Sequence, residues 1–286
     1  MTINNHEYRI RPASLSETAE IMVEWAAKEG WNPGLYDADC FYKTDPNGFL
    51  VGFVDQVPVS CISLVKYTPA FGFLGFYIVH PDFRGRGYGL KIWEAAIEIA
   101  GPANIGLDGV VDQQENYKKS GFSLAWRNIR YQGESRKYPH NSNNIESISQ
   151  NIIEMVLHYD ANLFPSNRSL FLRNWLSLPE SYAFAYIAQD KARGYIVLRK
   201  CRNGYKIGPL FADSPEIAEN LLFHTLYQLP AETVFFIDIP EVNTDALRII
   251  QKTGLQKMFE TARMYTGSFP GLDMRKIYGV TSLELG

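Results

Sequence analysis

The sequence predicts an α/β fold made of two units that follow one another along the chain. Apolar, β-branched runs typical of strands alternate with segments whose apolar residues recur at helical spacing. The same order of elements can be followed twice along the 286 residues. This length is sufficient for two domains of ordinary size. The repeated order of elements is therefore the main reason to expect two related units.

The first half begins with a strand at 8–11 and a helix from Ser16 and Glu17 to about Lys28. The apolar stripe of that helix indicates one buried face. A second short helix is expected at 35–42. Further strands are expected at 48–54, 59–67, 71–79, 104–111 and 122–132, and further helices at 87–100 and 113–119.

The second half follows the same order. Its first helix is expected at 159–178, and Ser214-Pro215 is a favourable N-cap and first-turn pair for a later one. Strands are expected at 182–188, 194–199, 205–211, 233–239 and 256–266, and helices at 215–228 and 244–253.

A short internal match supports a duplication. Lys119-Ser120-Gly121 ends one predicted helix, and Lys252-Thr253-Gly254 ends the corresponding helix of the second half. Arg130 and Arg263 each follow the glycine of their half by nine residues. The two halves are therefore expected to be related copies.

Composition narrows the class of protein. Hydrophobic residues are 46% and charged residues 21%, a normal globular balance. The net charge of −3 argues against a nucleic-acid partner, which usually meets a basic face. The three cysteines and five histidines show no metal-ligand spacing, so no metal is expected. The polar start at 1–11 and the lack of an 18-residue apolar run predict a protein without a membrane partner. The three widely spaced cysteines indicate the cytoplasm. A monomer or homodimer is expected.

The most informative stretch is 76–89, where a strand leads through a glycine-rich loop into a helix. The apolar strand ends at His80-Pro81, and the helical pattern begins near Gly87. Glycines let backbone N–H groups approach an anion, and the helix N-terminus adds about half a positive charge. Position 90 is Leu rather than the third glycine of a dinucleotide fingerprint, and no Gly-Lys-Ser/Thr of a Walker loop follows. The loop is thus a predicted phosphate cradle of another kind.

Arg84, Gly87 and Gly89 match the pattern Arg/Gln-x-x-Gly-x-Gly/Ala, and residues 8–132 have the element order β-α-α-β-β-β-α-β-α-β. In both respects the chain resembles the GCN5-related N-acetyltransferases (GNAT family). The resemblance implies tandem GNAT-type domains, each a mixed, mostly antiparallel twisted sheet flanked by helices. It also implies a splayed strand at the acyl-CoA site and acetyl-CoA as cosubstrate. We expect a GNAT domain at 1–135, a linker at 136–150 and a GNAT-like accessory domain at 151–286.

The resemblance also implies roles for individual residues. Tyr117 stands in the family pattern Tyr-x-x-x-Gly-Phe and would protonate the leaving thiolate. A backbone N–H near Ile78 or Val79 would polarise the thioester carbonyl. Many relatives place Asn where this chain has Val110, so Gln113, Gln114 or Asn116 would have to replace that contact. The residues expected to bind the cofactor are Ile78, Val79, Arg84, Gly85, Arg86, Gly87, Tyr88, Gly89 and Asn116.

The sequence does not single out the general base that would deprotonate the acceptor amine. Asp108 lies on an apolar strand, where burial would raise its pKa, and it is either catalytic or a hydrogen-bonded structural carboxylate. Other candidates are His80, Glu29, Asp37, Asp39, Asp160, Asp238 and Glu260.

The second half departs from the family pattern where the loop is expected. Acidic residues stand between Phe211 and Leu221, and Ile250 takes the position of Tyr117. This half is therefore not expected to hold acyl-CoA, and it either packs on the first half or walls the substrate pocket. Aromatic residues cluster in the first helices and could also line that pocket: Trp25, Trp31, Tyr36, Phe41 and Tyr42.

The function implied is transfer of an acetyl group from acetyl-CoA to a primary amine of a small molecule. Three alternatives are kept: a peptide or protein N-acetyltransferase, a non-catalytic acyl-CoA-binding sensor, and a purely structural tandem.

Overall fold

The structure, a computed structural model, describes residues 7–286, so the first six residues of the polar start lie outside the description. The strands are β1 (Tyr8–Pro12), β2 (Phe49–Val54), β3 (Val57–Thr68), β4 (Phe71–Val79), β5 (Asn104–Val110), β6 (Ser123–Glu134), β7 (Ile145–Ser147), β8 (Ser181–Ala188), β9 (Lys191–Lys200), β10 (Tyr205–Ala212), β11 (Val234–Pro240), β12 (Gln256–Tyr265) and β13 (Ile277–Gly279). The α-helices are α1 (Leu15–Glu17), α2 (Glu24–Lys28), α3 (Asp37–Thr44), α4 (Tyr88–Ala100), α5 (Gln114–Lys119), α6 (Gln150–Asp160), α7 (Ser169–Trp175), α8 (Pro215–Tyr227) and α9 (Thr244–Thr253).

The first helical region begins earlier than expected. Ser14 caps α1, and its hydroxyl accepts from the Glu17 N–H while the Glu17 carboxylate accepts from the Ser14 N–H. This reciprocal capping box fixes the start of the helix. A π-helical segment, Thr18–Val23, then joins α1 to α2.

The helix expected at 159–178 is two helices, α6 and α7. Pro165 lies between them and cannot continue a helix, because it lacks an N–H and clashes with the preceding turn. The segment 136–150, expected as a linker, contains β7 and the first residue of α6. β7 pairs antiparallel with β8, so this part of the chain belongs to the sheet of the second half.

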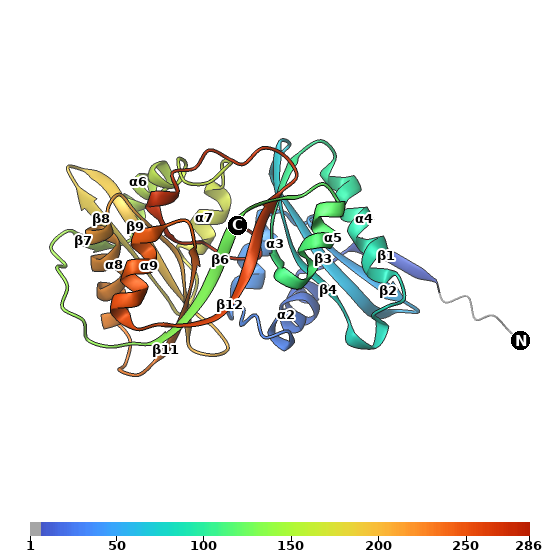
Figure 1. The fold of residues 1–286 in the computed structure, drawn as a ribbon, viewed down its shortest axis with the longest axis horizontal. Helices are drawn as coiled ribbons and strands as arrows, with labels where there is room; N and C mark the ends of the chain where they lie inside the picture. The colour runs from blue at the N-terminus through green and yellow to red at the C-terminus, as the bar shows by residue number, and fades with distance from the viewer. Residues whose placement is uncertain (1–6) are drawn as a thin grey trace, which may run out of the picture.

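The described strands form one continuous sheet in the order β1-β2-β3-β4-β5-β12-β6-β11-β10-β9-β8-β7, with β13 pairing with β10 beside this path. Most neighbours are antiparallel, and the pairs β4–β5 and β10–β11 are parallel. Figure 1 shows the two halves side by side, with β6 and β12 running between them. The mixed, mostly antiparallel tandem architecture predicted from the sequence is confirmed.

The two halves exchange their last long strands, which the sequence did not indicate. β6 of the first half pairs with β11 of the second, and β12 of the second half pairs with β5 of the first. β6 and β12 also pair with each other. Each half therefore completes its sheet with a strand from the other.

Two symmetric ion pairs join the halves at this exchange. Arg130 on β6 lies opposite Asp238 on β11, with Nε–Oδ1 and Nη2–Oδ2 distances of 2.7 Å. Arg263 on β12 lies opposite Asp108 on β5, with Nε–Oδ2 and Nη2–Oδ2 distances of 3.0 and 2.5 Å. All four side chains are buried. The two arginines matched in the sequence thus occupy equivalent positions in a duplicated arrangement.

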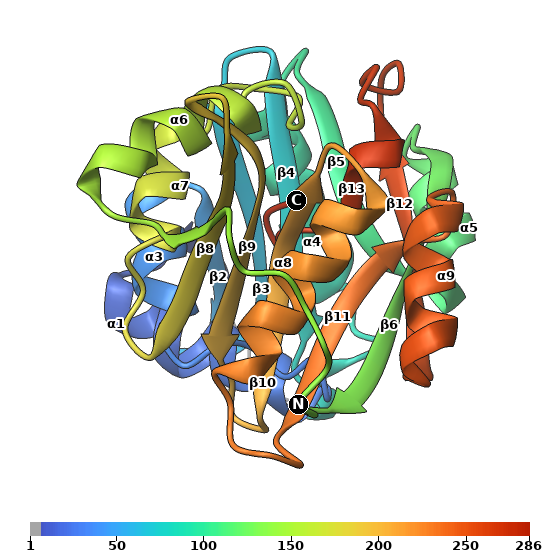
Figure 2. The same cartoon turned by 90° about the vertical axis from the view of Figure 1, so that its left-hand side faces the viewer.

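Helices cover both faces of the sheet. α4 and α5 pack on one face of the first half through Ile92, Trp93 and Tyr117, and α8 and α9 cover one face of the second half (Figure 2). α2 and α3 share a further core with α6 and α7 of the other half, where Phe41 stacks on Trp175 at 5.6 Å. The halves therefore share hydrophobic core as well as sheet.

Candidate active site

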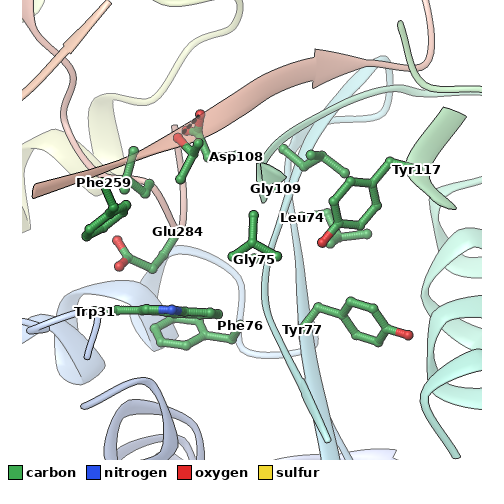
Figure 3. A pocket seen from close by; sticks show the side chains of 14 residues that line it. Trp31, Leu74, Gly75, Phe76, Tyr77, Asp108, Gly109, Tyr117, Phe259 and Glu284 are labelled. Atoms are coloured by element: carbon green, nitrogen blue, oxygen red, sulfur yellow. Dashed lines mark hydrogen bonds between the residues drawn. The ribbon is translucent and has the colours of Figure 1, made fainter. Parts of the chain in front are cut away.

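The site begins where β4 and β5 part. Their parallel pairing runs from Phe71 and Asn104 to Leu74 and Leu107 and ends there. The register of β3 against β4 shifts after Gly75, and Phe76 has a φ of 46°. This irregularity turns the end of β4 away from β5, as bulges commonly do next to active sites. The result is an opening in the sheet between two otherwise neighbouring strands (Figure 3).

The glycine-rich loop lies at the end of β4. Gly85 and Gly87 have φ values of 75° and 82°, a region that side chains other than glycine rarely adopt. A Cβ at Gly89 would lie 2.8 Å from Tyr77 Oη. Gly87 is the N-cap of α4, so the first free N–H groups of this 13-residue helix face the loop. The loop thus has the open backbone and helix end that suit a diphosphate.

The loop arginines differ in their surroundings. Arg84 donates to the Val79 carbonyl over 3.0 Å and pairs with Glu29. The Arg86 guanidinium lies over the Phe83 ring at 5.2 Å. These contacts hold both side chains next to the loop, and Glu29 forms an ion pair with Arg84.

Two adjoining cavities lead from the loop into the opening. We call the first the loop groove; it runs from the loop past the end of β5. Among the residues predicted to bind the cofactor, those that line the loop groove are Ile78, Val79, Arg84, Gly85, Gly87, Tyr88 and Gly89. Arg86 and Asn116 do not line it, whereas Gln113, one of the alternatives to Asn116, does. Asn116 instead donates to Gln113 Oε1 over 2.8 Å.

We call the second cavity the inner cavity, and it extends between β4 and β5 (Figure 3). Four residues line both cavities: Trp31, Tyr77, Val110 and Tyr117. The second half contributes Phe259 and Thr261 from β12 and Leu283 and Glu284 from the segment 280–286. A ligand in the loop groove can therefore reach a chamber built by both halves.

Tyr117 lies at the junction of the two cavities, and its hydroxyl points toward the middle of the inner cavity in Figure 3. Its ring stacks on Trp93 at 5.5 Å. A Cβ at Gly109 would lie 2.1 Å from the Tyr117 ring, so glycine is needed there to accommodate it. Burial raises the pKa of the Tyr117 phenol, which keeps it protonated at neutral pH. The neutral phenol therefore lies where the two cavities meet.

Asp108 also lines the inner cavity, but its oxygens are well occupied. Besides Arg263, Asn128 donates to Oδ1 over 2.7 Å and Thr261 donates to the same oxygen over 3.3 Å. Burial raises the pKa of Asp108, and the Arg263 guanidinium opposes that shift. These contacts favour the structural alternative for this carboxylate over the catalytic one.

Several other carboxylates considered as bases are also held in ion pairs. Asp37 accepts from Arg199 Nε over 2.9 Å, and Asp160 accepts from Arg168 over 2.6 and 2.8 Å. Asp238 pairs with Arg130 as described, and Glu29 pairs with Arg84. Of these, only Glu29 is a lining residue of the loop groove, and it lies at the loop end.

The equivalent opening in the second half is filled by its own chain. The parallel pairing of β10 and β11 runs from Tyr205 and Phe235 to Ile207 and Ile237. Beyond it, β13 pairs with β10 at Leu210. The Val280 N–H, just after β13, donates to the Asp238 carbonyl on β11 over 2.9 Å. A strand thus occupies the position that the inner cavity has in the first half.

Sequence reasoning missed part of the site. Of the five aromatics that could line the pocket, Trp31 lines both cavities, whereas Trp25, Tyr36, Phe41 and Tyr42 line neither. Glu284 gave no signal, because it lies far along the chain from the loop and in no motif. Gly75 allows its approach, since a Cβ there would lie 2.2 Å from the Glu284 carbonyl oxygen.

Within residues 7–286, every helix is too short or too polar to span a lipid bilayer. The same residues do not bring three or more His, Cys, Asp or Glu side chains together in a way that could hold a metal ion.

Comparison with known proteins identifies the family. Residues 15–122 match the Acetyltransferase (GNAT) family, and residues 156–279 match an Acetyltransferase (GNAT) domain. The chain is 34% identical to holothin acyltransferase from Pseudoalteromonas sp. (strain SANK 73390) over 276 residues, which cover 96% of this chain and 94% of that protein.

Two solved structures share the fold. A putative acetyltransferase from Pyrococcus horikoshii is 24% identical, with a TM-score of 0.83 and coverage of 98% of this chain and 96% of that one. A tandem GNAT protein from the clavulanic acid biosynthesis pathway is 13% identical, with a TM-score of 0.65 and coverage of 92% and 100%. The chain therefore belongs to the GNAT family of acyltransferases, with two GNAT-type domains in tandem.

Proposed function

We propose that the protein transfers an acetyl group from acetyl-CoA to a primary amine of a small molecule. GNAT enzymes use an acyl-CoA cosubstrate, and the acetyl donor and the small acceptor are the specific parts of the proposal. In it, residues 1–135 bind the donor, and residues 151–286 form an accessory domain that bounds the acceptor space.

The observation that carries the proposal is the continuity of the loop groove with the inner cavity at Tyr117. The loop groove offers the glycine loop and the N-terminus of α4 to a diphosphate. The inner cavity is narrow, and residues of both halves line it. β12 and the segment 280–286 close one side of it, which favours a small acceptor over a folded protein.

The chain's own groups suffice for the transfer we propose. Beyond Leu74, the β5-facing edge of β4 lacks its ladder partner. Because the His80 N–H bonds to Val59 on β3, the N–H of Val79 faces the opposite edge, where it can polarise the thioester carbonyl, whereas that of Ile78 faces β3. Tyr117 can protonate the departing thiolate, because it lines both cavities at the junction where the sulfur would lie. Binding both substrates in adjoining cavities supplies the orientation that makes the attack effectively unimolecular.

The test is a thiol-release screen with acetyl-CoA against amino acids, polyamines, aminoglycosides and holothin, the compound in the name of the related acyltransferase. Longer acyl-CoA donors test the acetyl preference in parallel. Release of free thiol with a small amine supports the proposal. Release only with peptides or proteins would favour a protein acetyltransferase, and acetyl-CoA binding without release with any acceptor would favour a sensor.

A further inference from the structure

The segment 280–286 brings one carboxylate into the inner cavity that nothing above has used. Glu284 lines this cavity and is only 3% exposed. Its Oε2 atom is buried and has no hydrogen-bond partner among residues 7–286. A buried carboxylate oxygen without a partner is costly and calls for an explanation. Asp108, the other carboxylate that lines the inner cavity, is occupied by Arg263 and Asn128.

The backbone holds this carboxylate in a defined place. The Val280 N–H is bonded to β11, and the Leu285 N–H donates to Ser282 Oγ over 2.9 Å. The Leu285 carbonyl accepts from Tyr67 Oη over 2.9 Å. The Glu284 backbone packs directly against Gly75, in the part of β4 that turns away from β5. Backbone contacts before and after Glu284 therefore hold its side chain at the opening between β4 and β5.

Three buried cations lie near Glu284. Arg130, Arg199 and Lys206 are buried nearby and interact electrostatically with it. Two of these cations have partners of their own, since Arg130 pairs with Asp238 and Arg199 with Asp37. Lys206 donates to the Trp31 carbonyl over 3.2 Å.

We propose that Glu284 binds the ammonium group of the acceptor and takes its proton, as the general base of the transfer. In Figure 3 its carboxylate lies near Trp31 and Phe259, and Tyr117 approaches the cavity from the other side. An acid and a base on opposite sides of the reacting carbon suit a reaction in which one bond forms as another breaks. This assignment rests on the proposed function, because it requires a thioester at the junction of the two cavities.

The step balances as follows. Glu284 takes one proton from R–NH₃⁺, and the freed lone pair forms the C–N bond at the thioester carbon. The C–S bond breaks with its electron pair on sulfur, which takes the proton of Tyr117. The second proton lost by nitrogen restores Tyr117 through solvent, and Glu284 releases its proton to water. The sum is R–NH₃⁺ plus acyl–S–CoA giving acyl–NH–R, CoA–SH and H⁺.

A purely structural Glu284 would only balance the buried cations. Loss of stability on substitution cannot separate the two roles, since either would produce it. The discriminating property is recognition of a positive charge placed at the acceptor position. A ligand that carries such a charge on coenzyme A itself makes the test independent of the acceptor's identity.

The experiment compares S-(2-aminoethyl)-coenzyme A with S-propyl-coenzyme A by calorimetry. The two thioethers have the same length, and only the first places an ammonium beyond the sulfur. A charge-assisted contact with Glu284 should make the wild-type protein bind the aminoethyl compound at least about tenfold more tightly. Glu284→Gln should abolish that preference while binding the propyl compound as before, and Glu98→Gln, on the exposed face of α4, should retain it.

The outcomes separate the two proposals. Equal binding of both thioethers by wild type would overturn the role of Glu284 and leave the acyl-CoA site intact. Retention of the preference in Glu284→Gln would also overturn it. Failure of both thioethers to bind would refute the proposed function and this assignment together, whereas binding of the propyl compound alone would overturn only the role of Glu284. If Glu284→Gln does not fold, the milder Glu284→Asp, which draws the carboxylate back from the cavity, should reduce the preference, and an unchanged preference would overturn the role of Glu284.

Discussion

At the scale of single residues, the reaction that we propose depends on Tyr117. Replacing it with phenylalanine removes the proton donor and keeps the ring that stacks on Trp93. We expect Tyr117→Phe to lower turnover by about 10²-fold or more, the usual scale for a general acid, with donor affinity unchanged. Thiol release and calorimetry with acetyl-CoA measure the two quantities. Unchanged turnover would remove Tyr117 from the mechanism.

Gly109 controls the position of that tyrosine. A methyl group there would overlap the Tyr117 ring, so the ring must move or the strand must shift. We expect Gly109→Ala to reduce turnover and to destabilise the protein by about 1–3 kcal/mol, the usual cost of overpacking. Gly271→Ala is the control, because a Cβ there meets no atom within 4 Å. Equal behaviour of the two variants in activity and urea denaturation would contradict this account.

At the scale of elements, the loop before α4 should determine donor binding. A Cβ at Gly87 points into open space, and a glutamate there would place a negative charge where the diphosphate is expected. Acetyl-CoA should raise the melting temperature of the wild type, and Gly87→Glu should abolish that shift. Gly271→Glu adds the same charge elsewhere and should keep it. A full shift in Gly87→Glu would locate the nucleotide at another site.

The start of α1 should make stability depend on pH. The hydrogen bond from Arg11 lowers the pKa of Glu17 to about 2, against about 4.3 in an unfolded chain. The contribution of this carboxylate is therefore present above about pH 4.3 and is lost as pH falls toward 2. Glu17→Gln can keep the capping box but does not titrate. Its urea midpoint should fall less between pH 5 and pH 3 than that of wild type. An identical fall would exclude this role for Glu17.

At the scale of the whole molecule, the strand exchange should make the two halves unfold together. Arg130→Met and Arg263→Met each leave a buried aspartate unpaired, which typically costs about 3–5 kcal/mol. Because both ion pairs connect the halves, calorimetry should show one transition at a lower temperature for each variant. Arg9→Met, which breaks an exposed pair, should change stability by less than about 1 kcal/mol. Two separate transitions in the wild type would contradict the coupling.

The course of the chain after β12 explains why only the first half keeps its opening. The first half keeps its opening between β4 and β5, whereas β13 fills the equivalent opening of the second. The same stretch of chain then continues as segment 280–286 into the first half and brings Glu284 to the inner cavity. The second half thus has no such opening of its own, and it contributes residues to the inner cavity of the first half. It therefore both packs on the first half and walls the pocket, the two roles left open from the sequence.

The sequence by itself determined the features that depend on neighbours along the chain. The glycine loop, the helix after it and the Tyr-x-x-x-Gly-Phe pattern are local, because glycine conformation and helical periodicity act over a few residues. The family and the tandem order followed from these motifs. Arg130 and Arg263 were recognised as equivalent, although their partners were not.

Only the tertiary structure decided which strands became neighbours and which side chains met. β6 and β12 have similar apolar patterns, and such a pattern specifies a buried face without specifying the adjacent strand. Their exchange, the filling of the second opening by β13 and the arrival of Glu284 in the inner cavity all join residues far apart in sequence. Such contacts depend on the packing of the complete chain, and therefore no local sequence motif predicts them.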